Sequence, residues 1–303
     1  DRVTPAAMAA IAAAHRRLGT GAILPTLISG GRAQIASALA AVAVPPPGVA
    51  GLHLEGPALA AARRGIHPAT AIRPLDPGEI ASLLAGPRPL LLTLAPETVP
   101  PGTIARLAGA GIQVFAGHTE ADAATLRAAL DEGLAGITHL FNALPPLAAR
   151  APGPIGVALA DPRCRAGIIA DLRHVDPLLL RLAWRCLGPD RLFLVSDAMP
   201  TVGADLAGFR LGGLSIRLHE GRLTGPDGTL GGAHLCLAQA VRHAVAAGIP
   251  TADALRMATA TPGRLLGAPG LAAGAAPGRI APGARLPLLR LDPGLHMRGW
   301  FPA

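Results

Sequence analysis

Five ionisable side chains each stand at the end of a short apolar run, and their types suit metal-assisted hydrolysis. They are Glu55, His118, His139, Asp171 and Asp197. One carboxylate and two imidazoles form an incomplete ligand set for Zn²⁺ or Fe²⁺, with positions left for water and substrate. We therefore expect Glu55, His118 and His139 to bind a divalent metal ion, one per chain.

Asp197 is the candidate catalytic residue. Metal coordination lowers the pKa of bound water toward about 7, and a neighbouring carboxylate can take its proton and pass one to a leaving amine. A single His or Glu at a strand end is more often structural, and the three ligands are too far apart in sequence to match a local metal motif. The prediction therefore depends on strands that bring these residues together.

The elements that would do so alternate along the chain. Nearly continuous apolar runs are typical of parallel strands buried on both faces. We predict such strands over residues 22–27, 50–55, 90–96, 111–118, 136–141, 166–171 and 191–197. We predict helices over residues 4–18, 32–43, 77–85, 102–110, 121–132 and 177–186, with Thr119 as a cap for the fifth. Polar residues at the carboxyl ends of strands converge in a barrel, which favours an α/β fold of the (β/α)₈ TIM type. We predict seven strands, however, and a closed barrel of this type has eight.

The rhythm changes in the last third of the chain. Residues 209–218 and 222–230 are predicted to form short β elements around the turn at Asp227-Gly228. Helices are expected over residues 233–247 and 251–266, the second broken near Thr261-Pro262, and one strand over residues 286–291.

Composition limits the function classes. Half of the 303 residues are hydrophobic and 15% are charged, which excludes a disordered chain, and no apolar run is long enough for a membrane helix. The net charge is +8, but the 27 basic residues are all scattered Arg and only 2% of residues are aromatic, so we expect no nucleic-acid partner. The three cysteines are predicted to be free thiols in a reducing compartment, which favours the cytoplasm.

Several segments resemble the N-acetylglucosamine-6-phosphate deacetylase family of the amidohydrolase superfamily. They occur in the family's order from about residue 5 to the C-terminus. The matching segments are Gly51–Pro57 (GLHLEGP), Thr93–Glu97 (TLAPE), Ala116–Thr119 (AGHT), Thr138–Ala143 (THLFNA), Gly167–Asp171 (GIIAD) and Leu194–Met199 (LVSDAM).

The resemblance implies roles for individual residues. Glu55, His118 and His139 match the metal ligands, and Asp197 matches the catalytic aspartate. It also implies a homodimer, in which Arg150 reaches the phosphate in the partner's site. The implied substrate-binding residues are Ile66, His67, Asn142, Ala143, Arg150, Asp171, His174, Leu230, Gly231 and Gly232.

The resemblance also divides the chain. Family members carry an N-terminal β segment and a first barrel strand ahead of the point where this sequence starts. We therefore expect a barrel of the metal-dependent hydrolase kind over residues 1–275 with its first strand missing, and a remnant of a small β-sandwich over residues 276–303. Ala58 and Leu172 replace a large aromatic residue and a Gly of the family pattern, which leaves the exact sugar open.

The leading hypothesis is hydrolysis of N-acetylglucosamine 6-phosphate to glucosamine 6-phosphate and acetate. One alternative is deacetylation of another N-acyl amino sugar phosphate. A second alternative is a catalytically silent, metal-binding barrel, suggested by the missing strand. The metal's identity, a mono- or binuclear site and the oligomeric state stay open at this point.

Overall fold

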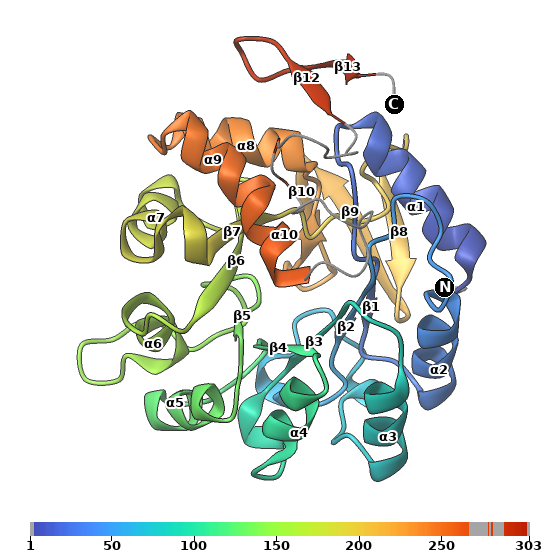
Figure 1. Ribbon diagram of the computed structural model, residues 1–303, viewed down its shortest axis with the longest axis vertical. Helices are drawn as coiled ribbons and strands as arrows, with labels where there is room; N and C mark the ends of the chain where they lie inside the picture. The colour runs from blue at the N-terminus through green and yellow to red at the C-terminus, as the bar shows by residue number, and fades with distance from the viewer. Residues whose placement is uncertain (1–2, 267–277, 279, 281–287, 302–303) are drawn as a thin grey trace.

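A seven-stranded parallel sheet forms the centre of the protein, in a computed structural model that describes residues 3–266, 278, 280 and 288–301. The strands follow one another in chain order around the curled sheet, and β1 and β7 are its two ends (Figure 1). This arrangement confirms the predicted barrel-type α/β fold and all seven predicted strands. The strands are β1 (Thr26–Ile28), β2 (Leu52–Glu55), β3 (Leu90–Leu94), β4 (Gln113–Ala116), β5 (Gly136–Ile137), β6 (Arg165–Ile169) and β7 (Leu192–Val195).

Helices surround this sheet, as expected for βα units (Figure 1). Side chains cap the starts of several helices: Asp76 accepts hydrogen bonds from the backbone of the first turn of α3, and Asp122, rather than Thr119, does so for α5. No helix of the described ranges is both long and apolar enough to cross a bilayer. The helices are α1 (Pro5–Arg17), α2 (Arg32–Ala41), α3 (Pro77–Ala85), α4 (Thr103–Gly109), α5 (Ala123–Asp131), α6 (Gly153–Ala160) and α7 (Pro177–Arg191).

Two of these helices differ from the prediction. Helix α6 was not expected, because its first residues, Gly153 and Pro154, are usually read as a break; Pro is nevertheless well suited to the first turn of a helix. Helix α7 continues past the predicted end at residue 186 to Arg191. Its path is kinked at Gly188, whose φ of 66° interrupts the helical backbone before Pro189.

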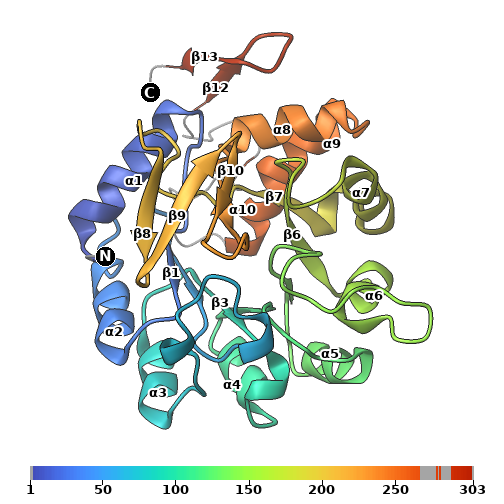
Figure 2. The same ribbon diagram turned by 180° about the vertical axis from the view of Figure 1, so that it is seen from behind.

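A second, four-stranded antiparallel sheet lies beside the barrel and near α1 (Figure 2). Its strands β8 (Gly208–Leu211), β9 (Leu214–His219), β10 (Arg222–Thr224) and β11 (Leu230–Ala233) confirm the predicted β elements. Helices α8 (Leu237–Ala246), α9 (Thr251–Ala258) and α10 (Ala260–Leu266) follow, and the expected break falls at Thr259, two residues before Thr261.

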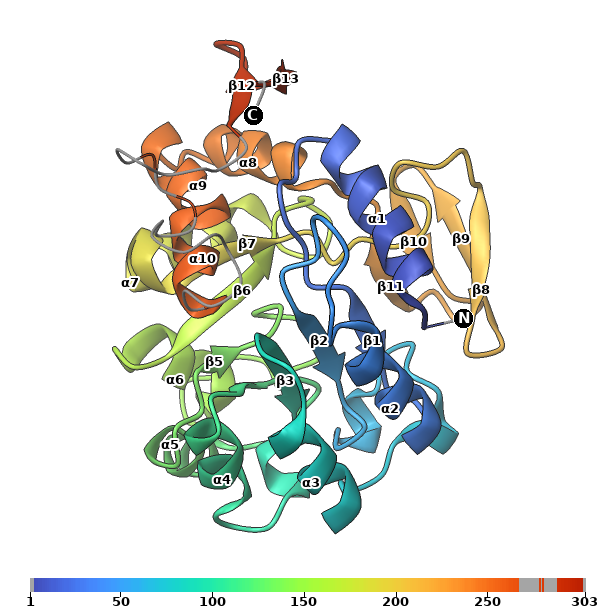
Figure 3. The same ribbon diagram turned by 45° about the vertical axis from the view of Figure 1, so that its right-hand side comes forward.

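The C-terminal strands form a separate hairpin. β12 (Leu289–Leu291) lies within the predicted strand and pairs with β13 (Met297–Trp300), which was not expected. The hairpin projects beyond α8, away from the barrel (Figure 3). The predicted boundary between residues 275 and 276 lies outside the described residues, so the division into two domains stays a prediction.

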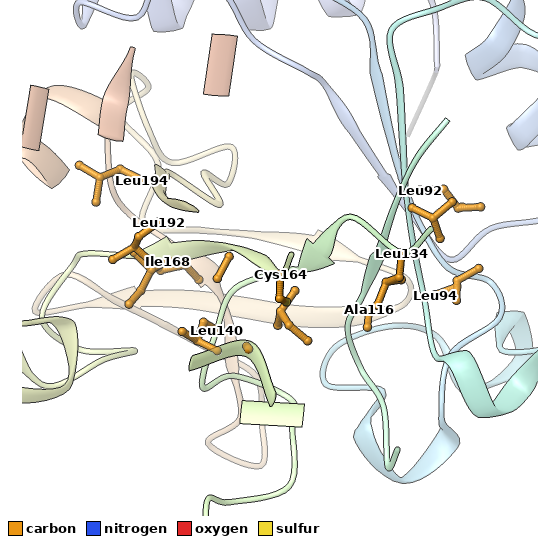
Figure 4. Packing of buried hydrophobic residues seen from close by; sticks show 14 of the residues in the cluster. Leu92, Leu94, Ala116, Leu134, Leu140, Cys164, Ile168, Leu192 and Leu194 are labelled. Atoms are coloured by element: carbon orange, nitrogen blue, oxygen red, sulfur yellow. The ribbon is translucent and has the colours of Figure 1, made fainter. Parts of the chain in front are cut away.

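Successive side chains of a strand point to opposite faces, which separates the core residues from the residues of the site. In β2, Leu52 and Leu54 are buried in the hydrophobic core, whereas His53 bonds to Thr93 of the neighbouring β3 and Glu55 contacts His139, which follows β5. Side chains from β3, β4, β6 and β7 pack together in this core (Figure 4). All three cysteines are free, as predicted.

Helix α7 offers a matched test of the core. Leu180 is fully buried and Leu178, in the same first turns, is 63% exposed. We expect Leu180→Ala to lower the free energy of unfolding by about 2–5 kcal/mol because it leaves a cavity, and Leu178→Ala by less than about 1 kcal/mol. Urea denaturation of both variants measures the difference, and equal shifts would contradict this packing of α7.

Candidate metal centre and active site

The five polar residues singled out from the sequence all lie at the carboxyl end of the barrel strands. Glu55 is the last residue of β2. His118, His139, Asp171 and Asp197 each follow the last residue of their strand by two positions, after β4, β5, β6 and β7. Because parallel strands present these ends to one mouth, the fold brings together residues that are distant in sequence.

Glu55, His118 and His139 form a tight, buried triangle. Oε1 of Glu55 lies 3.0 Å from Nε2 of His139 and 3.3 Å from Nε2 of His118, and the two Nε2 atoms are 3.1 Å apart. Each residue is at most 7% exposed. A tetrahedral ion with bonds of about 2.0 Å separates its ligand atoms by about 3.3 Å, so the triangle has the size of one face of such a site.

Hydrogen bonding assigns the ring nitrogens of His118. Its Nδ1 lies 2.7 Å from the carbonyl oxygen of Arg63, which can only accept, so Nδ1 carries the proton. This leaves Nε2 of His118, which faces Glu55 and His139, as the ring nitrogen that can bind an ion. The donor set of two imidazoles and one carboxylate therefore fits Zn²⁺ or Fe²⁺.

The charges in the centre act on one another. Burial opposes ionisation of Glu55, but hydrogen bonds from His118, His139 and His67 outweigh it and hold its pKa well below the usual range. Burial would lower the pKa of His139, yet its hydrogen bond to Glu55 and the charges of Glu55 and Asp197 raise it. For Asp197, burial and the nearby Glu55 charge both raise the pKa.

Strained backbone is concentrated around this mouth. Among the described residues other than glycine, eight have positive φ, a conformation that costs about 1–3 kcal/mol and persists where the surroundings enforce it. Six of the eight follow barrel strands at the site: His118, His139, Phe141, Ala143, Leu172 and Asp197. Surrounding contacts thus hold both candidate imidazole ligands and the candidate catalytic aspartate in unfavourable backbone conformations.

His67 joins the triangle from a loop. It is 2% exposed, and its Nε2 lies 3.6 Å from Oε2 of Glu55. The backbone N–H of Ser29 donates to Nδ1 (3.2 Å), so the proton of neutral His67 is on Nε2, facing the centre. Burial also lowers the pKa of His67, which favours the neutral ring. Sequence reasoning missed Ser29; its place directly after β1, at the same mouth, was the available signal.

Asp171 and His174 form a second pair. Oδ2 of Asp171 lies 2.7 Å from Nδ1 of His174, and Oδ1 accepts the backbone N–H groups of Arg173 and His174. Burial opposes ionisation of Asp171, but the His174 hydrogen bond and these N–H groups lower its pKa. Both carboxylate oxygens of Asp171 are thus used within the loop, which leaves Nε2 of His174 for a ligand.

Strand β11 brings the predicted glycine loop to the site. A Cβ on Gly231 would lie 3.5 Å from Ile66, and one on Gly232, whose φ is 69°, would lie 3.2 Å from the carbonyl oxygen of Asp197. The backbone N–H of Ala233 donates to that same carbonyl (2.8 Å). Leu230, the first residue of β11, is half-buried. The antiparallel sheet is therefore joined to the segment that carries Asp197.

The predicted phosphate-binding residues lie on the segment after β5. The backbone N–H groups of Phe141 and Ala143 donate to no group within the described chain, and φ is positive at both residues. Asn142 donates its backbone N–H to the carbonyl oxygen of His139. Arg150 is exposed in a tight turn between Ala148 and Ala151, and no contact among the described residues brings it to the metal triangle.

A polar chain that the sequence reading did not identify runs below the triangle. His53 bonds through Nδ1 to the hydroxyl of Thr26 (3.0 Å) and through Nε2 to that of Thr93 (2.8 Å), and Thr93 bonds to Thr138 (2.7 Å). Burial lowers the pKa of His53 to about 4, so this ring is neutral. The chain links strands β1, β2 and β3 to the residue that precedes His139.

Curated relatives cover most of the sequence. The N-acetylgalactosamine-6-phosphate deacetylase of Shewanella sp. (strain ANA-3) is 37% identical over 287 residues, which are 92% of this chain and 71% of that protein. The enzyme of the same name from Escherichia coli O157:H7 is 33% identical over 93% of this chain and 76% of its own length. Human N-acetylglucosamine-6-phosphate deacetylase is 35% identical over 84% and 64%. No family model matches the sequence.

Solved structures agree with these relatives. N-acetylglucosamine-6-phosphate deacetylase from Pasteurella multocida superposes with a TM-score of 0.92 at 29% identity, covering 99% of this chain and 79% of that one. A mutant of the Mycobacterium smegmatis enzyme in complex with N-acetyl-D-glucosamine-6-phosphate gives 0.85 at 35% identity, over 96% and 80%. The chain therefore belongs to the family of N-acetylglucosamine- and N-acetylgalactosamine-6-phosphate deacetylases.

Proposed function

We propose that this protein hydrolyses the acetamide of an N-acetylated hexosamine 6-phosphate, releasing acetate and the free amino sugar phosphate. The observation that carries the proposal is the buried triangle of Glu55, His118 and His139 beside Asp197. We assign Zn²⁺ or Fe²⁺ to the triangle, one ion per chain. When bound, such an ion polarises the acetyl carbonyl and lowers the pKa of a coordinated water.

Residues of the chain supply the proton transfers. Asp197 takes a proton from the attacking water and delivers it to the amide nitrogen as the C–N bond breaks, so water's remaining O–H becomes part of acetate. The N–H at Nε2 of neutral His67 is placed to donate a hydrogen bond to the oxygen that gains negative charge in the transition state. Gly231 and Gly232 hold β11 against Ile66 and the Asp197 segment.

We assign the phosphate to the segment after β5. The free N–H groups of Phe141 and Ala143, both at positive φ, make an anion-binding concavity, which supports the role of Ala143. Asn142 lies between these two residues on the same segment. His174, aligned by Asp171, is a further donor. The exposed Arg150 suits the predicted homodimer, in which it binds the phosphate in the partner subunit's site. A phosphorylated substrate and free cysteines favour a cytoplasmic enzyme.

The sugar is either of two epimers that differ at C4. N-acetylglucosamine 6-phosphate is the substrate that the sequence motifs favour, and the human and P. multocida proteins carry that name. The Shewanella and E. coli relatives are named for N-acetylgalactosamine 6-phosphate, which makes this epimer the second candidate.

Acetate release tests the reaction and the sugar together. We expect the metal-loaded protein to release acetate from one or both epimers, because both share the acetamide and the phosphate. Removal of the ion by a chelator should abolish turnover, and Zn²⁺ or Fe²⁺ should restore it. A folded, metal-loaded protein that releases no acetate from either sugar would contradict the proposal and favour a silent barrel.

Asp197→Asn should separate catalysis from metal binding. We expect turnover to fall by about 10²–10⁴-fold, with bound metal retained, because the proton acceptor is lost. The raised pKa of Asp197 means that the metal-free fold loses stability as the pH rises from the ordinary aspartate range through the raised value. The metal-free variant should therefore melt higher than wild type at pH 7, with a smaller gain near pH 4. Wild-type turnover in the variant would exclude Asp197.

Arg150→Ala should raise KM for the phosphorylated sugar by about 10- to 100-fold, the usual range for a charged hydrogen bond, and leave the unphosphorylated sugar unaffected. Arg106→Ala, another exposed Arg, is the control.

Mixing Arg150→Ala with Asp197→Asn subunits tests the homodimer, because a hybrid dimer has one site with both native residues. Recovery of the native KM supports a role across the interface; no recovery contradicts it.

A further inference from the structure

The metal ligand His118 depends on unusual local geometry. Its φ of 48° lies in the left-handed region, and its ring must present Nε2 to the triangle. The carbonyl oxygen of His118 accepts the backbone N–H of Ala60 (2.8 Å), and its Nδ1 contacts the Arg63 carbonyl. These contacts fix the residue on one side, so the chain that follows it must be held by something else.

A single carboxylate holds that following chain. Oε2 of Glu97 accepts the hydroxyl of Thr119 (2.5 Å), and Oε1 accepts the backbone N–H of Glu120 (2.7 Å). Thr119 is fully buried, and its hydroxyl oxygen also accepts the N–H of Ala121 (2.9 Å). Glu97 itself lies in the short helix η3 (Pro96–Thr98), directly after β3, and is not a member of the ligand set.

A second set of contacts connects Glu97 to the ring of His118. The carboxylate of Glu120, whose backbone Glu97 binds, forms an ion pair with Nε of Arg63. Arg63 in turn provides the carbonyl oxygen that accepts from Nδ1 of His118. Glu97 therefore acts on both the backbone after His118 and, through Glu120 and Arg63, the acceptor that orients the imidazole.

We propose that Glu97 is a positioning residue for the metal site, holding His118 in its strained conformation through Thr119 and Glu120. The inference rests on the proposed metal function of the triangle. Charge-assisted hydrogen bonds from a carboxylate to N–H and O–H groups are stronger than neutral ones, which suits the enforcement of a left-handed backbone. Partners of metal ligands typically change metal affinity by about 10–100-fold when they are removed.

Glu97→Ala tests the proposal through metal affinity. We expect the Kd for Zn²⁺, measured by competition with a chromophoric chelator, to rise by about 10–100-fold. Glu97→Gln keeps one acceptor and should fall between Glu97→Ala and wild type. Thr119→Val, which removes only the buried hydroxyl, should weaken Zn²⁺ binding in the same direction.

Glu132 provides the matched control. Its carboxylate also accepts backbone N–H groups, from Gly102 (2.8 Å) and Ala105 (3.4 Å), but shares no hydrogen bond with residues 118–120 in the described chain. Glu132→Ala should therefore leave the Kd for Zn²⁺ at the wild-type value, even where it lowers the melting temperature as much as Glu97→Ala does.

The outcomes separate the two levels of inference. Equal Zn²⁺ affinity in Glu97→Ala and wild type, with wild type binding metal and releasing acetate, overturns the positioning role alone. Equal weakening in Glu97→Ala and Glu132→Ala also overturns it, because the effect then reports general stability. Failure of wild type to bind Zn²⁺ or Fe²⁺ and to release acetate overturns the proposed function as well.

Discussion

The requirement to hold one carboxylate and two imidazoles within about 3 Å of one another, away from water, constrains the rest of this structure. Glu55, His118 and His139 come from β2, β4 and β5 respectively, so their convergence needs a sheet whose carboxyl ends meet. Buried polar groups at this spacing are stable only with paired charges and hydrogen bonds, which Arg63 and His67 supply. His118 and His139 have the strained backbone that this demand imposes.

The same burial gives two nearby carboxyl groups opposite tendencies. Glu55 is surrounded by imidazoles, and their hydrogen bonds keep its pKa low, as suits a ligand. Asp197 lies near the Glu55 charge with burial unopposed by such hydrogen bonds, so its pKa is raised, as suits a group that accepts and returns a proton. Environment thus shifts the pKa of two chemically similar side chains in the opposite directions that their proposed roles require.

Periodicity predicted the barrel because its signal is local. Strands of a parallel sheet are buried on both faces, so each one is a nearly continuous apolar run in the sequence, as residues 90–96 are. Such a run can be recognised without knowing which strands lie beside it. Helix α6 was missed because Gly and Pro at its start are ambiguous in sequence, and β13 because its residues Met297–Trp300 show no alternation. Thr119 looked like a helix cap, yet the cap is Asp122 and the Thr119 hydroxyl bonds to Glu97.

The sequence by itself determined the family and the candidate site: side-chain types at strand ends, and motifs in a family's order, predict the ligand set and the role of Asp197. Only the tertiary structure decided how those groups are oriented. It showed that the Ser29 N–H directs the proton of neutral His67 to Nε2, and that the Arg63 carbonyl directs a proton of His118 to Nδ1. It also showed that Glu97 accepts a backbone hydrogen bond from the segment after His118. Such contacts join backbone and side-chain atoms from separate loops, and no pattern in the sequence records them because they depend on where those loops meet.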